Sequence, residues 1–201
     1  MATTISGTTG VTFPAGGVGN PAGTVVGTTD SQTLTNKTLT SPTIGGTPTM
    51  NTSVITSGTA VASTSGTSID FTGIPSWVKR LTVMFYGVST NGTSRIIIQL
   101  GTSSGFTTSG YLGSNSSANF STGIFTDDAG NAAAVRYTQT VITNITGNTW
   151  VATSNMGRSD ALGVYTTGGG IALSGTFDRI RITTSNGTDT FDAGSINILY
   201  E

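Results

Sequence analysis

The stretch RLTVMFYGVSTNGTSRIIIQLG, residues 80–101, decides the fold class, because it contains two strand patterns separated by a turn. In its first half Leu81, Val83 and Phe85 alternate with other side chains, which is the period of a β-strand with one buried face. Its second half, RIIIQLG (95–101), is rich in β-branched residues that favour strands. The turn STNGTS contains Asn-Gly, the strongest short hairpin signal, and so predicts an antiparallel hairpin.

Strand patterns of the same kind continue on both sides of this stretch. They are SIDF (68–71), AVRYTQTVITNI (134–145), TWVATS (149–154), GIALSG (170–175), FDRIRITT (177–184) and GSINILYE (194–201). A second Asn-Gly turn, TSNGTD (184–189), predicts another hairpin. About eight strands in about 140 residues fit a single antiparallel β-sandwich, jelly-roll-like, which we place at residues 62–201. Trp77 and Phe85 are expected in its core.

The composition excludes several classes of chemistry. The chain has no cysteine and no histidine, which removes disulfides, thiolate ligands, cysteine nucleophiles and the commonest general base. Charged residues make up 8% of the chain and the net charge is -1, which argues against an electrostatically bound nucleic acid. We expect no cofactor.

Residues 31–61 differ from the rest, because they carry one apolar side chain at every fifth or sixth position. Between these positions lie Thr, Ser, Asn, Gly and Pro, which are poor helix formers. A single chain this poor in apolar area cannot offset its conformational entropy, whereas several stacked chains can. We therefore predict an intertwined homotrimeric β-shaft; the alternative is a flexible Gly/Ser-rich linker. The predicted axis residues are Leu34, Leu39, Ile44, Met50, Ile55 and Val61.

Residues 1–30 are Gly-rich and nearly uncharged, and they predict an extended segment that threads against a partner protein. The candidate contacts are Phe13, Pro14, Val25 and Val26. The N-terminus lacks the basic and apolar regions of a signal peptide, and no apolar stretch approaches the length that spans a bilayer. We therefore expect synthesis in a cytoplasm and no insertion into a membrane.

Several segments resemble proteins of one class. TTDSQTLTNKTLTSPTIGG (28–46) resembles a stretch found in tail fibres and other appendages of tailed bacteriophages, and GVTFP (10–14) looks like the start of such fibres. Residues 68–94 and the ending FDAGSINILYE (191–201) are similar to the C-terminal domain of phage fibre proteins. The resemblance implies a homotrimer with an N-terminal virion anchor at residues 1–30, a thin shaft and a C-terminal globular tip. It also implies a location on the virion.

Candidate receptor-binding residues lie in two polar segments that the strand patterns leave as loops, 101–123 and 154–163, and at Trp150, which follows the turn residues GN (147–148). Glycan binding needs aromatic faces together with amides, hydroxyls and carboxylates. The candidates are Tyr111, Trp150, Asn155, Arg158 and Asp160, each with a structural role as the alternative.

Metal binding and catalysis have weaker sequence support. Asp127, Asp128 and Asn131 lie in the tight turn TDDAGN (126–131), where oxygen ligands can hold calcium, but their spacing matches no established calcium loop. A glycosidase needs two carboxylates about 5–10 Å apart, and the acidic residues here lie mostly in turn-like contexts. We therefore expect a protein without enzymatic activity.

Three functions follow from these observations, in order of preference. The first is adsorption to a host surface polysaccharide by the C-terminal tip of a trimeric fibre. The second is a purely structural head fibre, decoration or tail adaptor that binds no receptor. The third is a glycan-degrading tailspike.

Overall fold

The computed structural model describes residues 55–128, 130–132 and 134–201, together with a few isolated positions between residues 33 and 46. The chain divides into two compact units, Met1–Thr49 and Met50–Glu201. The predicted anchor residues lie outside the described residues, as do four of the predicted axis residues. These are Phe13, Pro14, Val25 and Val26 of the anchor, and Leu34, Leu39, Ile44 and Met50 of the axis.

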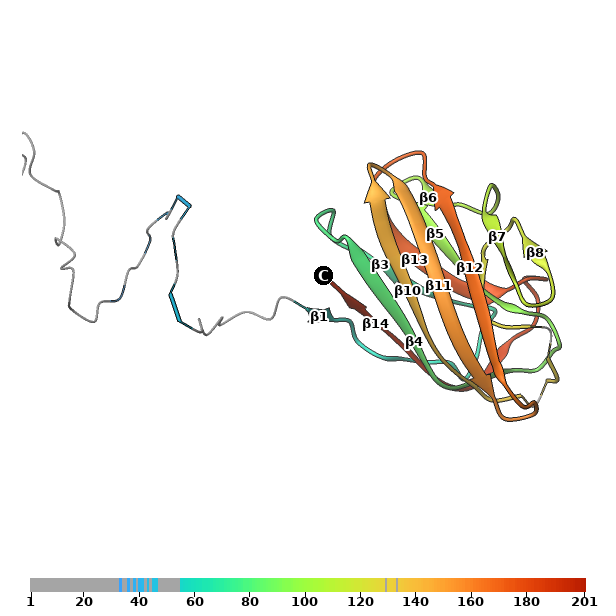
Figure 1. Cartoon of the computed structure of the whole chain (residues 1–201). Helices are drawn as coiled ribbons and strands as arrows, with labels where there is room; N and C mark the ends of the chain where they lie inside the picture. The colour runs from blue at the N-terminus through green and yellow to red at the C-terminus, as the bar shows by residue number, and fades with distance from the viewer. Residues whose placement is uncertain are drawn as a thin grey trace, which may run out of the picture. The chain divides into compact units, whose positions relative to one another are not determined.

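The second unit is all-β over its described residues and contains two antiparallel sheets (Figure 1). The larger, nine-stranded sheet has the order β1-β14-β4-β10-β11-β12-β7-β8, with β2 also paired to β14. Its strands are β1 Thr56–Ser57, β2 Val61–Ala62, β4 Arg80–Thr90, β7 Leu112–Asn115, β8 Asn119–Phe120, β10 Arg136–Thr146, β11 Thr149–Arg158, β12 Val164–Ala172 and β14 Phe191–Tyr200. The smaller sheet has the order β3-β13-β5-β6, with β9 paired to β5. Its strands are β3 Ser68–Thr72, β5 Ile96–Thr102, β6 Gly105–Phe106, β9 Ile124–Phe125 and β13 Phe177–Thr184.

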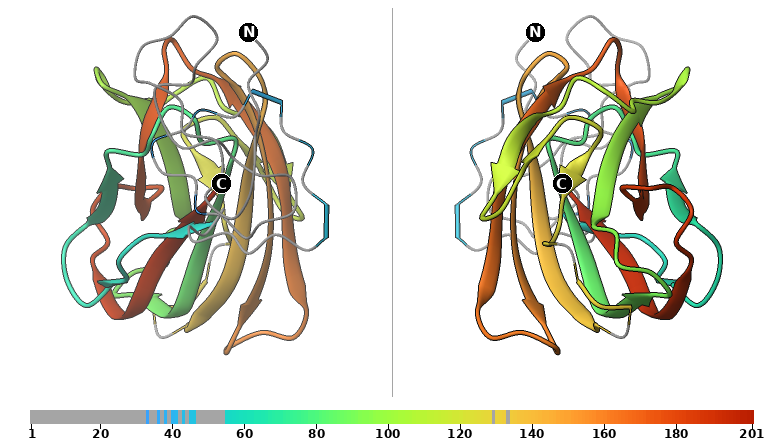
Figure 2. Two further views of the ribbon diagram at one scale, coloured as in Figure 1. Left: turned by 90° about the vertical axis from the view of Figure 1, so that its left-hand side faces the viewer. Right: turned by 90° about the vertical axis from the view of Figure 1, so that its right-hand side faces the viewer.

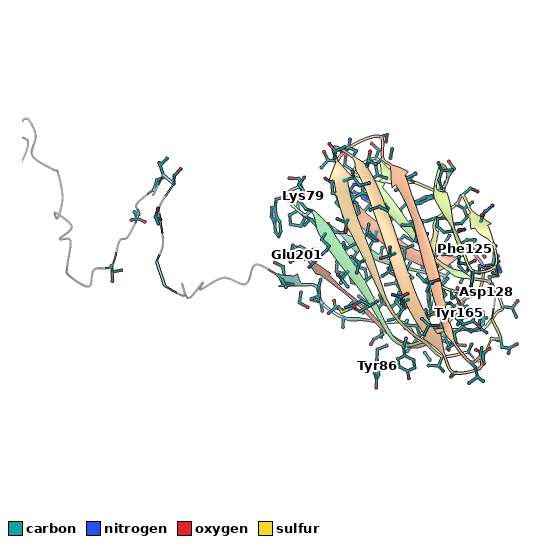
Figure 3. The ribbon with its side chains drawn as sticks, in the orientation of Figure 1. Lys79, Tyr86, Phe125, Asp128, Tyr165 and Glu201 are labelled. Atoms are coloured by element: carbon teal, nitrogen blue, oxygen red, sulfur yellow. The ribbon has the colours of Figure 1, made fainter. Side chains whose placement is uncertain are left out.

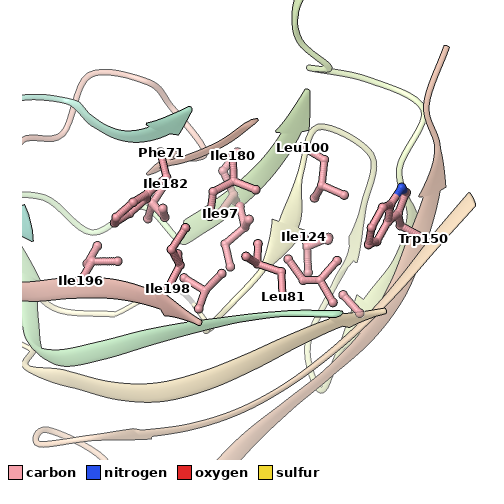
Figure 4. Close-up of a cluster of buried hydrophobic side chains, with 14 of the residues drawn as sticks. Phe71, Leu81, Ile97, Leu100, Ile124, Trp150, Ile180, Ile182, Ile196 and Ile198 are labelled. Carbon is pink, nitrogen blue, oxygen red and sulfur yellow. The ribbon is translucent and has the colours of Figure 1, made fainter. Parts of the chain in front are cut away.

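The two sheets face each other across one hydrophobic core (Figure 2). Leu81 of the larger sheet and Ile98 and Ile180 of the smaller one are fully buried in it. Full burial of each such side chain contributes about 1.5–3 kcal/mol. Figure 4 shows this cluster, with Trp150 at its edge and the indole nitrogen turned away from the aliphatic side chains. No helix in the described part of the chain is long and apolar enough to cross a bilayer.

The predicted all-β class and the eight predicted strand runs are confirmed, because each run lies in or overlaps a strand of the structure. The predicted hairpins at the two Asn-Gly turns are wrong. Residues 91–95 join β4 to β5 and residues 185–190 join β13 to β14, so both turns cross from one sheet to the other. The two turns lie against each other: the Thr190 amide donates to Asn91 Oδ1 at 2.8 Å, and the Ser94 amide donates to Asp189 Oδ2 at 3.0 Å.

Two further expectations differ from the structure. Strand β1 begins next to Ile55, and Val61 lies in β2; both strands pair with β14, so the second unit begins before the predicted boundary at residue 62. Trp77, expected in the core, is 54% exposed and lies against Tyr200 with ring centroids 5.8 Å apart. Phe85 is buried as expected.

Candidate functional site

A cluster of arginines, directly before β5, in β10 and in β11, surrounds the aspartates of the segment that follows β9, residues 126–135. At its centre the Asp127 carboxylate is fully buried. It accepts a hydrogen bond from Arg136 Nε at 2.5 Å and another from the Ile96 amide at 2.9 Å. The Arg136 guanidinium is also fully buried and donates through Nη1 to the Ala134 carbonyl at 2.9 Å. This pair therefore fastens the segment to both sheets.

Two more ion pairs surround the buried pair. Arg95 Nη2 donates to Asp128 Oδ1 at 2.8 Å, and Figure 3 shows Asp128 near Phe125, whose ring lies 5.2 Å from the Arg95 guanidinium carbon. Arg158 binds Asp160 through Nε and Nη2, both at 2.8 Å. The Asn131 amide donates to Asp160 Oδ2 at 3.1 Å. The three carboxylates thus face three guanidinium groups at close range.

The surroundings shift the pKa values of Asp127 and Asp160 in opposite directions. Burial raises the pKa of Asp127 from its ordinary 3.8 to about 6, against the lowering effect of Arg136. The hydrogen bonds from Arg158 hold the pKa of the exposed Asp160 at about 2. Burial therefore disfavours the ionised form of Asp127 more than Arg136 favours it, whereas Arg158 favours the ionised form of Asp160.

This arrangement uses the residues that we considered as calcium ligands. Asp127 is bound by Arg136, Asp128 by Arg95, and the Asn131 amide by Asp160. No group of three or more acidic side chains suited to a metal ion occurs in residues 55–201 as far as they are described. Arginines thus bind both carboxylates that we considered as calcium ligands.

The structure separates the five candidate receptor residues. Tyr111 is fully buried, and its hydroxyl accepts from the Leu100 amide at 2.7 Å and donates to the Thr107 carbonyl at 2.9 Å. Trp150 is 4% exposed and packs on Phe177 with ring centroids 4.7 Å apart. Neither ring offers a face to a ligand, which corrects their assignment as receptor contacts. Arg158 and Asp160 bind each other, and Asn155 is exposed on β11.

The segments predicted as loops are also more regular than expected. Strands β6, β7 and β8 lie within 101–123, and β11 extends to Arg158, so Asn155 stands on a strand. Gly113 and Gly169 explain the tight pairing of β7 with β12: a Cβ on either glycine would meet the Phe120 ring at 2.3 or 2.4 Å. Glycine at both positions lets Phe120 cover this edge of the core.

The outward face of the nine-stranded sheet presents the exposed part of the molecule best suited to a ligand. We define it as the outward-pointing residues of β4, β10, β11 and β12, which alternate with the buried ones. At one end an open groove of about 620 Å³ runs over Gly170 between Leu112 and Val151. At the other end Tyr86 and Tyr137 are exposed. Sequence reasoning passed over both tyrosines, although Tyr86 follows Phe85 in an alternating strand and must therefore point outward.

The Arg158–Asp160 pair predicts an acid-sensitive contribution to stability. The folded-state pKa of Asp160, about 2, is lower than the ordinary 3.8. The contribution is therefore present above about pH 4 and is lost as the pH falls toward 2. We expect the unfolding free energy of Asp160→Asn to lie below that of the wild type near neutral pH, with the difference disappearing in acid. Urea denaturation across this range measures it, and a difference independent of pH would contradict the pairing.

Comparison of the chain with protein-family models, with curated proteins and with solved structures gives no match.

Proposed function

We propose that the chain is a trimeric bacteriophage virion fibre protein. Its N-terminal residues 1–30 attach to another virion protein, the apolar repeat from residue 31 up to the second unit forms the trimeric shaft, and the C-terminal unit contacts the host surface during adsorption. The resemblance of residues 28–46 and 191–201 to phage fibres supports the anchor and the trimer. The all-β unit that follows the apolar repeat is consistent with a tip.

The observation that carries the adsorption role is the outward face of the nine-stranded sheet. It consists of hydroxyl, amide, glycine and apolar side chains. Arg80 is the one charged residue among the outward positions of β4, β10, β11 and β12, all of which the structure describes. A face of this composition suits a neutral polymer rich in hydroxyl groups, such as a surface polysaccharide.

Repetition strengthens such a contact. Each fibre would carry three tips and each particle several fibres. Once one tip has bound, the particle holds the other tips near the surface, which raises their effective concentration. Individual contacts in the millimolar range are then sufficient for adsorption. The role requires no catalysis. Five aspartates each accept a hydrogen bond from an arginine: Asp70, Asp127, Asp128, Asp160 and Asp178.

A second candidate is a structural fibre or decoration that binds no host molecule. It is favoured by the positions of the candidate receptor residues, since Tyr111 and Trp150 are buried and Arg158 is bound to Asp160. Binding of the purified chain to host cells separates the two functions. We expect labelled protein to bind intact cells and not cells stripped of surface polysaccharide. Equal absence of binding to both, at trimer concentrations well above micromolar, would favour the structural role.

The proposed shaft predicts that a charge at Ile44 destabilises the trimer. In the proposed trimer Ile44→Asp places three carboxylates beside one another at an apolar axis, where unpaired charge is costly. We expect the variant trimer to dissociate at lower protein concentration and to melt at lower temperature than the wild type. Sedimentation and thermal melting measure these effects, and Thr43→Asp, one position away from the repeat, serves as the control. Unchanged assembly of Ile44→Asp would contradict the axis.

A further inference from the structure

Two tyrosines form an exposed aromatic pair on the outward face. Tyr86 of β4 is 73% exposed and Tyr137 of β10 is 49% exposed. Their ring centroids lie 5.5 Å apart with an interplanar angle of 85°, so each ring stands edge-on to the other. Figure 3 shows Tyr86 projecting from the body of the second unit, at the opposite end of β4 from Lys79 and Glu201. Large exposed aromatic rings in contact are unusual on a surface that has no use for them.

A bulge in the sheet creates this pair. Tyr86 pairs with Ser195 of β14. Around Tyr86, the register of β4 shifts relative to both of its neighbours, β14 and β10. Gly87, with φ of 68°, and Gly194, with φ of 91°, adopt the left-handed conformation there and lie close together. The extra residue in β4 leaves Tyr86 and Gly87 opposite Tyr137. Bulges commonly redirect a side chain next to a functional site.

Beside the tyrosines the face offers a gap and then polar side chains. Tyr137 pairs with Gly157, and a Cβ at Gly157 would meet no atom within 4 Å. The sheet surface at Gly157, next to Tyr137, is therefore open to a ligand. One step along the same face, Gln139 of β10 pairs with Asn155 of β11, and Asn155 pairs with Thr166 of β12. Residues two apart on a strand lie about 7 Å from each other on one face. The two amides and the hydroxyl therefore border the aromatic pair.

We propose that Tyr86 and Tyr137, with Gln139, Asn155 and Thr166, form a binding subsite for a neutral saccharide. The apolar C–H face of a pyranose ring packs on a tyrosine ring, and its hydroxyl groups hydrogen-bond to the bordering amides and the threonine. A neutral sugar matches a face on which Arg80, at the far end of β4, is the one charged outward residue of the four strands. The inference rests on the proposed adsorption role and assigns it to particular residues.

Tyrosine NMR on the full-length protein tests the subsite directly. The chain has five tyrosines, so a protein labelled with ¹³C-tyrosine gives few ring signals, which Tyr→Phe variants assign. The probes are glucose, galactose and N-acetylglucosamine. We expect at least one of them to shift the Tyr86 and Tyr137 signals with a dissociation constant in the millimolar range, while the buried Tyr111 stays unchanged. The absence of a saturable shift at these two rings with all three sugars would overturn the proposal.

Cell binding separates this inference from the function on which it rests. The double variant Tyr86→Ala/Tyr137→Ala is expected to fold normally, because both rings are exposed, and to bind host cells at least about tenfold more weakly. Trp77→Ala removes an exposed aromatic ring that lies outside the outward face, so it serves as the control and should bind as the wild type does. If the wild type and the double variant bind cells equally, the subsite is wrong and adsorption stands. If the double variant loses trimers instead, the face is an interface between copies and the subsite is wrong.

Discussion

Replacing Asp127 with Asn is expected to lower the free energy of unfolding by about 3–5 kcal/mol. Asn has nearly the same shape as Asp and can still accept from the Ile96 amide, which lies 2.9 Å from Oδ1. It cannot balance the charge of Arg136, whose side chain has no exposed surface. An amide that replaces Oδ2 also points a donor at Arg136 Nε. The loss therefore arises from an uncompensated buried guanidinium rather than from a cavity.

Urea denaturation at about pH 8, above the Asp127 pKa of about 6, measures this loss. The matched control is Asp70→Asn, because Asp70 accepts from Arg181 Nη2 at 2.7 Å while both side chains are about one-third exposed. The control should cost at most about 1 kcal/mol. Combining Asp127→Leu with Arg136→Met removes both charges and should recover most of the stability. If Asp127→Asn and Asp70→Asn lower the unfolding free energy equally, the buried pair stabilises the fold no more than the exposed one, and the prediction is wrong.

Gly194→Ala has the second largest expected effect. Gly194 has a φ of 91°, which a residue with a Cβ adopts at a cost of about 1–3 kcal/mol. A Cβ there would also lie 2.4 Å from the Gly87 carbonyl oxygen, so strands β4 and β14 must separate at the bulge. Together we expect a loss of about 2–4 kcal/mol in unfolding free energy. Because the bulge positions Tyr86, saccharide binding should weaken as well.

Gly168→Ala on β12 is the control for this variant. Gly168 lies on the outward face, has no left-handed φ, and a Cβ there would meet no atom within 4 Å. Alanine at this position should leave stability unchanged or raise it by about 0.5 kcal/mol, since it restricts the unfolded chain. Chemical denaturation of both variants gives the comparison. A Gly194→Ala protein as stable as Gly168→Ala would show that the bulge tolerates a side chain.

The strands of the core were predictable because their side chains carry the signal. The alternation of Leu81, Val83 and Phe85 with outward residues holds in the structure, and the apolar run at 96–98 is buried throughout. The connections were not predictable in the same way. Asn-Gly specifies a tight turn, and a turn that joins two strands of one sheet has the same local sequence as one that crosses between sheets. The pairing of Asn91 with Thr190, 99 positions away, decides between them.

Burial of the candidate side chains also could not be predicted, because it depends on residues that are distant in the sequence. Tyr111 lies in a Gly/Ser-rich segment that suggests exposure, but the backbone of Leu100 and Thr107 satisfies its hydroxyl inside the core. The sequence TDDAGN is typical of a polar turn, but the Asp127 carboxylate is buried because it binds the Arg136 guanidinium and the Ile96 amide. Tyr86 is the opposite case, because strand alternation alone places it outward. Its contact with Tyr137 required the register of the sheet.

The oligomeric state of the full-length chain tests the proposed fibre most directly. The apolar repeat between residue 31 and the second unit has too few apolar side chains to fold alone, so the proposal requires three chains around one axis. Sedimentation equilibrium of the purified protein is predicted to give a single species of three times the 20.3 kDa chain mass, stable on dilution. A folded species of 20.3 kDa that persists at all concentrations would contradict the trimeric fibre and its multivalent adsorption.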